Sequence, residues 1–491
     1  MKNLTRTIIL IPLLIFFLAQ SLYSQTSEAF EKYQNEQFGE FKKYKDERDG
    51  DFVKFLKQSW KEYDILDGAK RDVKPKPVMI PKTKPVVVPK NVISKAKKIK
   101  KVIVPVSIPK VTVIKKPLVK IKPERKSEFI EMSFYSAKFK VFIDPKYKMT
   151  PIHSVNKKTI SSFWEKMSHS EYEPFLKQAL SYKKQLKLND WGYHFLLLKI
   201  AKNIVNQNNY ANLFVWFMST KSGYESRVGY DKNKIYFLLP SKSKLYSIPF
   251  LRLDGKKFYA VSFDARPEKF KSIYTYSGKY PKASKLMDYT LPNLPEFKRK
   301  IQKKFLKFKY DNNSYNVSAL YNQNLVQFLE FYPQTDLKIY FDAKVPVETR
   351  YSLLKDFKNI LKGKNEVEAV SILLRFVQKA FPYKTDDKQF GREKYLLPGE
   401  MLSYKYSDCE DRSIFFAYLV KELVGLKVVG LFYPGHVATA IQFNSPVPGD
   451  YVKSQNSKFV ICDPTYINAG IGMAMPHFKN KRPSIIKIGK Y

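Results

Sequence analysis

Apolar residues in the middle of the chain follow first a helical and then a strand-like spacing. A buried helix is expected to open at Asp190-Trp191, and a second helix around 213–217 is expected to end at Gly223. Three short runs rich in β-branched and aromatic residues predict strands at 227–230, 234–239 and 258–263. Residues 129–335 are therefore expected to form a mixed α/β domain.

The pattern returns in residues 336–491 and predicts a second domain. A strand at 337–341 and helices at 347–361 and near 367–377 are expected first. A helix that is apolar on almost all sides is then expected to begin at Cys409 and to end at Gly425. The segments after it predict antiparallel strands at 426–433, 436–441 and 458–463. The expected fold class is α+β, with a helix packed on an antiparallel sheet.

Both domains show the same order of elements, which is two helices, a glycine, a strand, a turn and two further strands. The stretch 258–264 stands in the first domain where 459–463 stands in the second. The first domain has no Cys and no His in the corresponding places. We therefore consider the hypothesis that 129–335 is a degenerate, non-catalytic duplicate that binds substrate or a partner.

The first residues have the features of a secretory signal. Lys2 and Arg6 precede an apolar run, 8–18, that is short for a membrane span. Residues 1–24 are therefore expected to be a signal peptide, and the protein is expected in the periplasm or cell envelope. The alternative is an inner-membrane anchor formed by an uncleaved N-terminal segment.

Residues 25–69 carry aromatic side chains at helical spacing. They predict short amphipathic helices, with a turn at Asp49-Gly50 and with Trp60 and Tyr63 at the end of the second helix. This helical segment is expected to pack on the rest of the chain or to dock on a partner.

Residues 70–128 form a linker rich in Pro, Lys and Val. The stretch 70–127 holds 19 Lys or Arg and 2 acidic residues. Frequent prolines exclude a helix and like charges repel, so an extended chain with polyproline character is expected. Its Val and Ile residues leave room for pairing with the edge of a sheet.

The formal net charge of the whole chain is +43. For an exported protein, an anionic envelope surface that contacts the basic linker is the expected counterpart. An AT-rich genome, which also enriches Lys, explains the charge equally well. No aromatic-basic motif for nucleic acid is found, and nucleic acid is not an expected partner.

Cys409, His436 and Asp463 carry the most specific chemistry in the chain. Each has a suitable local setting, since Cys409 opens a helix, His436 follows a Pro-Gly turn and Asp463 ends a strand. A thiol, a base that ionises it and a carboxylate that orients the base are the parts of nucleophilic catalysis at amides. The helix dipole favours the thiolate of Cys409, whereas Glu410 and Asp411 oppose it.

Stabilising the oxyanion requires hydrogen-bond donors beside the thiol. The backbone N–H of Cys409 is one candidate, and Tyr383 and Gln389 are weaker candidates for the second. Cys462 neighbours Asp463 on a strand and is expected to point to the opposite face, so a disulfide with Cys409 is not favoured. No pattern predicts a metal site or a cofactor loop, and neither is expected.

At these residues the sequence resembles the transglutaminase-like superfamily. The resemblance covers about 347–475, and the matching stretches are Asp408-Cys409-Glu410-Asp411-Arg412-Ser413, Tyr433-Pro434-Gly435-His436-Val437 and Cys462-Asp463-Pro464-Thr465-Tyr466. It implies a papain-like α+β core with Cys409 as nucleophile, His436 as base and Asp463 as the residue that orients the base. Within this superfamily, the sequence is most similar to the exported bacterial cysteine peptidases.

Two functions from different classes remain open. The first is an exported thiol enzyme, a peptidase, an amidase or an acyl transferase, that forms a thioester on a protein, peptide or peptidoglycan-peptide substrate. The second is an inactive scaffold that binds or assembles components of the cell envelope. The sequence does not indicate an oligomeric state.

Overall fold

The computed structural model describes residues 45–71, 76–77, 79–86, 89–100, 102, 128–266 and 268–489. The predicted signal peptide and the first aromatic stripe lie outside these residues. Contacts divide the chain into two units, Met1–Trp60 with Asn156–Ser170, and Lys61–Val155 with Glu171–Tyr491. Among the described residues, no helix combines the length and the apolarity needed to cross a bilayer.

In the first unit, residues 45–58 form one helix that runs through Asp49-Gly50. The turn expected there is therefore wrong. Trp164, on α3 (Lys157–Ser168), donates from Nε1 to Asp49 Oδ1 at 3.3 Å, and its ring centroid lies 4.7 Å from that of Phe52. These contacts offset the intrinsic cost of a helical glycine, which is about 1 kcal/mol. Trp60 and Tyr63 lie on a strand, β1 (Trp60–Asp64), rather than on a helix.

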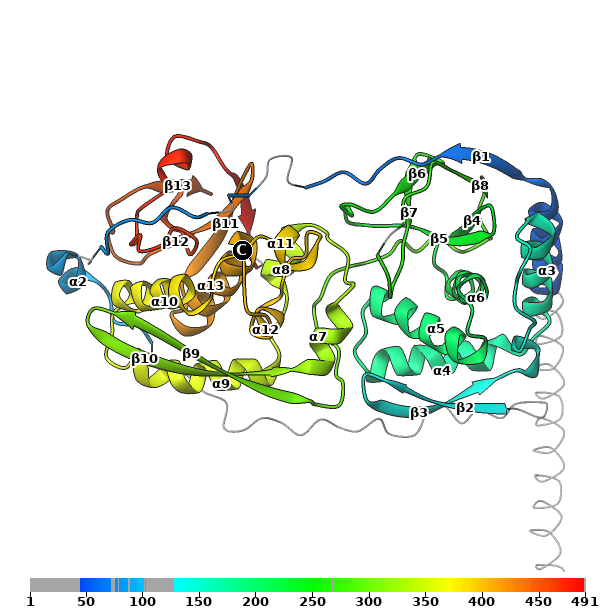
Figure 1. Cartoon of the computed structure of the whole chain (residues 1–491), viewed down its shortest axis with the longest axis horizontal. Coiled ribbons are helices and arrows are strands. Elements are labelled where there is room, and N and C mark those ends of the chain that lie inside the picture. Colours follow the sequence, from blue (N-terminus) through cyan, green and yellow to red (C-terminus); the bar gives the residue numbers. More distant parts are fainter. Residues whose placement is uncertain are drawn as a thin grey trace, which may run out of the picture. The chain divides into compact units, whose positions relative to one another are not determined.

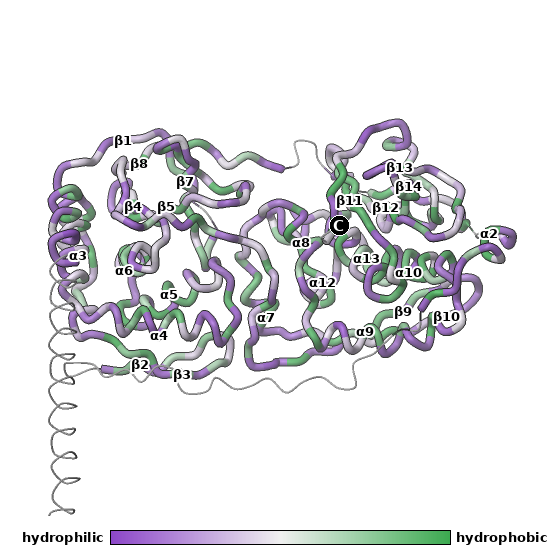
Figure 2. Tube along the Cα trace, turned by 180° about the vertical axis from the view of Figure 1, so that it is seen from behind, coloured by the Kyte–Doolittle hydropathy of each residue, from purple (hydrophilic) through white to green (hydrophobic). Residues whose placement is uncertain are grey.

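The C-terminal part of the second unit is a helix packed on an antiparallel sheet, as expected. The central helix α13 contacts β11 and β12 of the sheet, which has the order β13-β14-β12-β11-β15. Figure 1 shows α10 beside α13, and Figure 2 shows β11 as a strongly apolar strand. The elements of this part are α9 (Val347–Ile360), α10 (Glu366–Ala380), α11 (Asp386–Phe390), α12 (Pro398–Met401), α13 (Cys409–Leu423), β11 (Lys427–Tyr433), β12 (His436–Gln442), β13 (Tyr451–Ser454), β14 (Ser457–Cys462), a 3₁₀ turn η2 (Pro476–Phe478) and β15 (Ser484–Lys487).

Residues 337–341 are helical, and the strand expected there is wrong. They belong to α8 (Leu337–Asp342). A short apolar run fits a buried helix as well as a strand. Two contacts stabilise the helix. The ring of Tyr340 is buried, and its hydroxyl donates to the carbonyl oxygen of Pro333 at 3.0 Å. Phe341 packs against Gly430, in the space that a side chain at this glycine would occupy.

The middle part of the second unit has its own antiparallel sheet. Helix α6 packs on strands β4 and β5, and α5 packs on α6. The sheet order is β1-β8-β4-β5-β7-β6, so β1 is added at the edge beside β8. The elements are β2 (Glu128–Phe134), β3 (Ala137–Ile143), a 3₁₀ turn η1 (Pro145–Tyr147), α4 (Tyr172–Gln185), α5 (Asp190–Ile204), α6 (Asn208–Lys221), β4 (Arg227–Asp231), β5 (Lys234–Pro240), β6 (Phe250–Leu253), β7 (Lys256–Ala260) and β8 (Ser272–Tyr276).

The middle and C-terminal parts share one topology. When strands are matched in chain order, β8-β4-β5-β7-β6 has the same order as β15-β11-β12-β14-β13. In both, the central helix ends at a glycine with positive φ, Gly223 at +88° and Gly425 at +78°, before the first strand of the sheet. A β-hairpin precedes each set, and its strands contact α4 and α5 in one case and α9 and α10 in the other. Figure 1 shows both hairpins beside their helices.

The second hairpin consists of β9 (Ile301–Tyr310) and β10 (Asn313–Asn322), and helix α7 (Gln323–Leu329) follows it. It precedes the boundary predicted at residue 336, yet β9 packs on α10 and β10 on α9. The hairpin therefore contributes to the C-terminal core.

The described residues from Arg71 to Lys100, which we call the strap, pack on the C-terminal part. Ile467 donates its N–H to the carbonyl oxygen of Pro81 at 3.2 Å, and its carbonyl accepts from Thr83 N at 3.0 Å. The strap contains the short helix α2 (Lys90–Lys95), so the expectation that proline excludes helix here is wrong. The reason is that Pro89 stands before the helix, where its missing N–H removes no helical hydrogen bond.

Candidate active site

Cys409 is the first residue of α13, as the sequence predicts, and its side chain is 0% exposed. The turn before it is fixed by Asp411, whose Oδ2 accepts from the N–H of Asp408 at 3.3 Å and whose Oδ1 accepts from the N–H of Leu396 at 2.8 Å. These bonds hold the start of the helix in one place. The backbone N–H of Cys409, in the first turn, has no acceptor within the helix.

His436 and Asp463 lie side by side. His436 opens β12, and its Nε2 lies 2.8 Å from Asp463 Oδ2. The other carboxylate oxygen of Asp463 accepts from the N–H groups of Thr465 and Tyr466 at 2.8 and 3.3 Å. The carboxylate is therefore held from both sides and sets the tautomer of the imidazole.

The second imidazole nitrogen, Nδ1 of His436, is buried and has no hydrogen-bond partner. The ring stacks on Phe478 of η2, with centroids 5.0 Å apart and planes at 16°. An unpaired buried acceptor is costly, and such groups concentrate at sites of function. Nδ1 is thus available to take a proton.

The thiol of Cys409 bonds to its neighbour rather than to the imidazole. Its Sγ lies 3.0 Å from Glu410 Oε2. Burial raises the pKa of the Cys409 thiol well above its usual value, and the charges of Glu410 and Asp408 raise it further. The thiol is therefore neutral in this arrangement, and its hydrogen bond goes to Glu410.

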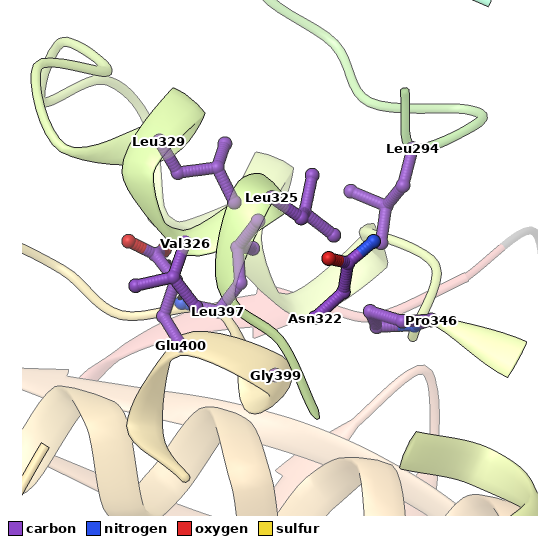
Figure 3. A pocket seen from close by; sticks show the side chains of 9 residues that line it. All are labelled: Leu294, Asn322, Leu325, Val326, Leu329, Pro346, Leu397, Gly399 and Glu400. Atoms are coloured by element: carbon purple, nitrogen blue, oxygen red, sulfur yellow. Dashed lines mark hydrogen bonds between the residues drawn. The ribbon is translucent and has the colours of Figure 1, made fainter. Parts of the chain in front are cut away.

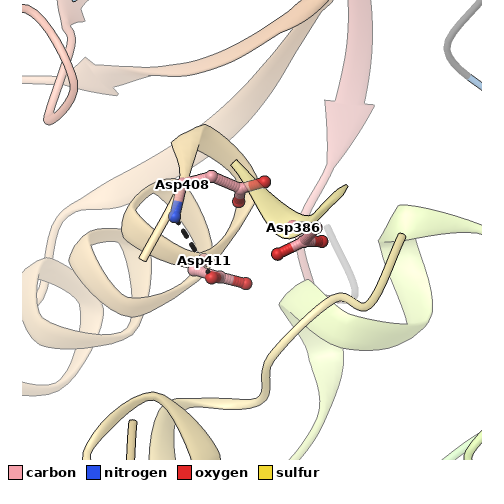
Figure 4. A group of neighbouring side chains, drawn as sticks. All are labelled: Asp386, Asp408 and Asp411. Carbon is pink, nitrogen blue, oxygen red and sulfur yellow. Dashed lines mark hydrogen bonds between the residues drawn. The ribbon is translucent and has the colours of Figure 1, made fainter. Parts of the chain in front are cut away.

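Four buried carboxylates surround the start of α13, and we call them the acidic pit: Asp386, Asp408, Glu410 and Asp411. Figure 4 shows three of them facing one another. Burial raises the pKa of Asp386 and Asp408 well above the usual range and that of Asp411 to about 7. The charges of Lys76 and Arg71 instead hold the pKa of Glu410 well below its usual value, although burial opposes this.

Three of these carboxylates, those of Asp386, Asp408 and Asp411, have oxygen atoms within 4.8 Å of one another, a spacing that suits a divalent cation. The ammonium of Lys76 lies 2.7 Å from Asp408 Oδ2 and 4.0 Å from Asp386 Oδ2. Lysine thus supplies at this point the positive charge that a metal would bring.

Tyr383 is the better placed of the two side-chain candidates for the oxyanion. Its hydroxyl is buried without a hydrogen-bond partner, and burial raises its pKa far above the usual value. A bridge to Ser407 fixes its backbone, and Arg412 donates from Nε to Ser407 Oγ at 3.1 Å. Gln389 instead points its Nε2 toward the carbonyl of Tyr406, at 3.5 Å.

Sequence reasoning missed the residues that support the site. Gln378 of α10 donates from Nε2 to the carbonyl oxygens of Asp463, Tyr466 and Ala469, at 2.8 to 3.2 Å, and so shapes the loop after β14. A polar residue on the apolar face of a predicted helix was the available signal. Lys76 had no such signal, because it is one of many lysines in the linker.

Cys462 and Cys409 are both free and buried, so they form no disulfide. His477 is exposed, with Nε2 2.7 Å from Lys481 Nζ. Figure 3 shows a small apolar pocket, lined by residues that include Leu325 and Glu400, with a volume of about 10 Å³. This volume holds about one water molecule and no substrate group.

Comparison of the chain with family models, with curated proteins and with solved structures gives no match.

Proposed function

We propose that the chain is a thiol-dependent enzyme of amide or peptide bonds that acts through Cys409, His436 and Asp463. The observation that carries this proposal is the buried His436–Asp463 pair, at 2.8 Å, whose second imidazole nitrogen has no partner. An imidazole that is oriented by a carboxylate through one nitrogen and has no partner at the other is suited to act as a general base. Ser413, one turn along α13 from Cys409, donates to the carbonyl oxygen of Val437 at 2.9 Å and ties this helix to β12.

The reaction would begin when the thiol of Cys409 leaves Glu410 and transfers its proton to Nδ1 of His436. The thiolate attacks the substrate carbonyl, and the N–H of Cys409 and the hydroxyl of Tyr383 stabilise the oxyanion. Collapse of this intermediate breaks the C–N bond, and the amine leaves with the proton from His436. Water, deprotonated by His436, then attacks the thioester, releases the acid and returns the proton to the thiol.

A helix packed on an antiparallel sheet, with the thiol at the tip of the helix, supports the resemblance to the transglutaminase-like superfamily and its papain-like core. We extend the proposal to an exported enzyme whose substrates are envelope proteins, peptides or peptidoglycan peptides. The positive charge of the chain suits such surroundings.

The shared topology supports the hypothesis that 129–335 is a degenerate copy. Asn208 opens α6 where Cys409 opens α13, and Lys234 opens β5 where His436 opens β12. Neither replacement supplies a thiol or an imidazole. The middle part would then serve binding rather than chemistry.

The second candidate is an inactive scaffold, and the bond between Cys409 Sγ and Glu410 favours it. Iodoacetamide labelling between pH 5 and 9, assigned to Cys409 by mass spectrometry, separates the two functions. It is measured in the wild type and in Glu410→Gln, each with and without His436→Ala, and His477→Ala serves as the control.

For an enzyme, we expect labelling of Glu410→Gln below pH 7 that collapses when His436→Ala is added and persists with His477→Ala. An ordinary thiol pH profile that is unchanged by His436→Ala would reject the catalytic proposal.

A further inference from the structure

The ammonium group in the acidic pit belongs to a residue far away in the sequence. Lys76 has a side chain that is 3% exposed, and its Nζ lies 2.7 Å from Asp408 Oδ2 and 2.9 Å from both Glu410 Oε1 and Glu393 Oε2. Arg71, five residues earlier in the strap, also contacts the carboxylate of Glu410. A charged side chain is rarely buried to this degree unless it is paired, and this one is paired with several carboxylates.

The pit adjoins the proposed nucleophile. Glu410 accepts the thiol of Cys409 through Oε2 and contacts the ammonium of Lys76 through Oε1. A single carboxylate group thus separates the bound lysine from Sγ.

From the pit, the strap continues to the loop that follows the carboxylate of the triad. Pro81 and Thr83 bracket Ile467 with two backbone hydrogen bonds, and Asn468 donates from Nδ2 to the carbonyl oxygen of Thr83 at 2.8 Å. Ile467 comes four residues after Asp463. The described strap residues therefore lead from the start of α13 to the loop after β14, as a substrate peptide would have to do.

We propose that the acidic pit is a subsite for a lysine side chain of the peptide substrate, and that Lys76 fills it in this structure as a substitute for the substrate. The proposal rests on the function proposed above and specifies its substrate class, which is a peptide with a lysine next to the bond that reacts.

The lysine in this subsite is recognised and not consumed. Burial lowers the pKa of Lys76, but Asp408, Glu410 and Asp386 together raise it well above the usual value. A protonated amine has no lone pair and cannot attack a thioester. Asp408 Oδ1 is buried without a hydrogen-bond partner, so the pit retains acceptor capacity for the three donors of an ammonium group.

The first test removes the charge and supplies it again from solution. Lys76→Met keeps the length of the apolar part of the side chain and removes the ammonium group. Lys84→Met is the control, because Lys84 is an exposed residue of the same strap. We expect Lys76→Met to melt at a lower temperature than the wild type. Adding n-butylammonium chloride should raise its melting temperature more than sodium chloride does, and Lys84→Met should show no such difference. Lys76→Gln is the second variant if Lys76→Met does not fold.

Unchanged melting of both Lys76 variants, or equal effects of n-butylammonium and sodium chloride on them, would overturn the subsite.

The second test measures binding without turnover. A fluorescent peptide with the sequence of residues 76–86 is titrated into Lys76→Met, and its first residue is either lysine or norleucine. We expect the norleucine peptide to bind about tenfold more weakly, because charge-assisted hydrogen bonds are lost. Equal affinities would contradict a lysine subsite. Neither readout needs a reactive thiol, so failure of the labelling experiment and failure of this proposal are distinguishable.

Discussion

At the residue scale, Glu410 controls the state of the thiol. Its buried carboxylate contacts the thiol of Cys409, the ammonium of Lys76 and the guanidinium of Arg71. Because Lys76 and Arg71 hold its pKa low against the effect of burial, the carboxylate stays negative at neutral pH. A negative acceptor beside a thiol keeps the proton on sulfur.

Replacing this carboxylate tests its effect on the thiol. Glu410→Gln removes the negative charge, so the pKa of Cys409 should fall and iodoacetamide labelling at pH 7 should become several-fold faster. Glu422→Gln near the other end of α13, where Glu422 pairs with Arg350, is the matched control and should leave the rate unchanged. A slower rate in Glu410→Gln would show that the carboxylate does not suppress the thiolate.

Asp411 predicts a dependence of stability on pH. Burial raises its pKa to about 7, whereas an aspartate in the unfolded chain titrates near pH 4. Folding therefore takes up a proton on Asp411 between these values, and this group alone should make the free energy of unfolding fall as pH rises from about 4 to about 7, by at most about 1.4 kcal/mol per pH unit. Asp411→Asn should reduce the slope by this contribution, and Asp386 and Asp408, whose pKa burial also raises, should keep a slope of the same sign.

Urea unfolding at several pH values measures the slope, and the difference between variant and wild type isolates Asp411. Asp387→Asn, at an exposed position of α11, should keep the wild-type slope. Parallel pH profiles for Asp411→Asn and wild type would contradict the shift. No pattern in the sequence predicts the raised pKa of Asp411, because this pKa depends on burial and on carboxylates that only the fold brings together.

At the scale of elements, the central helices α6 and α13 end in the same way. Gly425, at φ +78°, follows α13, and a Cβ at this position would meet no atom within 4 Å. Only the backbone conformation therefore opposes a side chain there, and Gly425→Ala should lower the free energy of unfolding by about 1 kcal/mol.

At Gly50, replacement by alanine should change the stability in the opposite direction. This glycine lies inside the helix 45–58, and a Cβ there would also meet nothing within 4 Å. Gly50→Ala should therefore stabilise this helix by about 0.5 to 1 kcal/mol. Urea titration of both variants checks the two signs, and a neutral Gly425→Ala would show that the positive φ is not required.

The elements around the site could be predicted because their signals are local. An apolar run after Cys409 and a glycine beyond it predict α13. A Pro-Gly turn predicts the register that places His436 at the start of β12. The segment 337–341 lacks such signals, and only the contacts of Tyr340 and Phe341 distinguish helix from strand. The helix through Gly50 likewise depends on Trp164, far away in the sequence.

At the scale of the whole molecule, order along the chain is predictable and long-range pairing is not. The repeated succession of helices, glycine and strands was visible in the sequence, and the two sheets share one strand order. The seating of Lys76 among buried carboxylates was not visible, because composition alone does not distinguish one lysine of the linker from its neighbours. More than 300 residues separate Lys76 from these carboxylates in the sequence, and no local pattern links residues so far apart.

The strap is also part of the chain whose site it occupies, and this affects how tightly a free peptide can bind. A ligand on a short tether is present at an effective concentration on the order of millimolar, whatever the dilution of the protein. A free peptide must therefore compete with a local concentration that never falls, and its apparent affinity is reduced accordingly. A single cut beside the strap would leave it tethered through its other end, so two cuts, one on each side, are needed to turn this permanent competitor into a ligand that dissociates and is lost to solution.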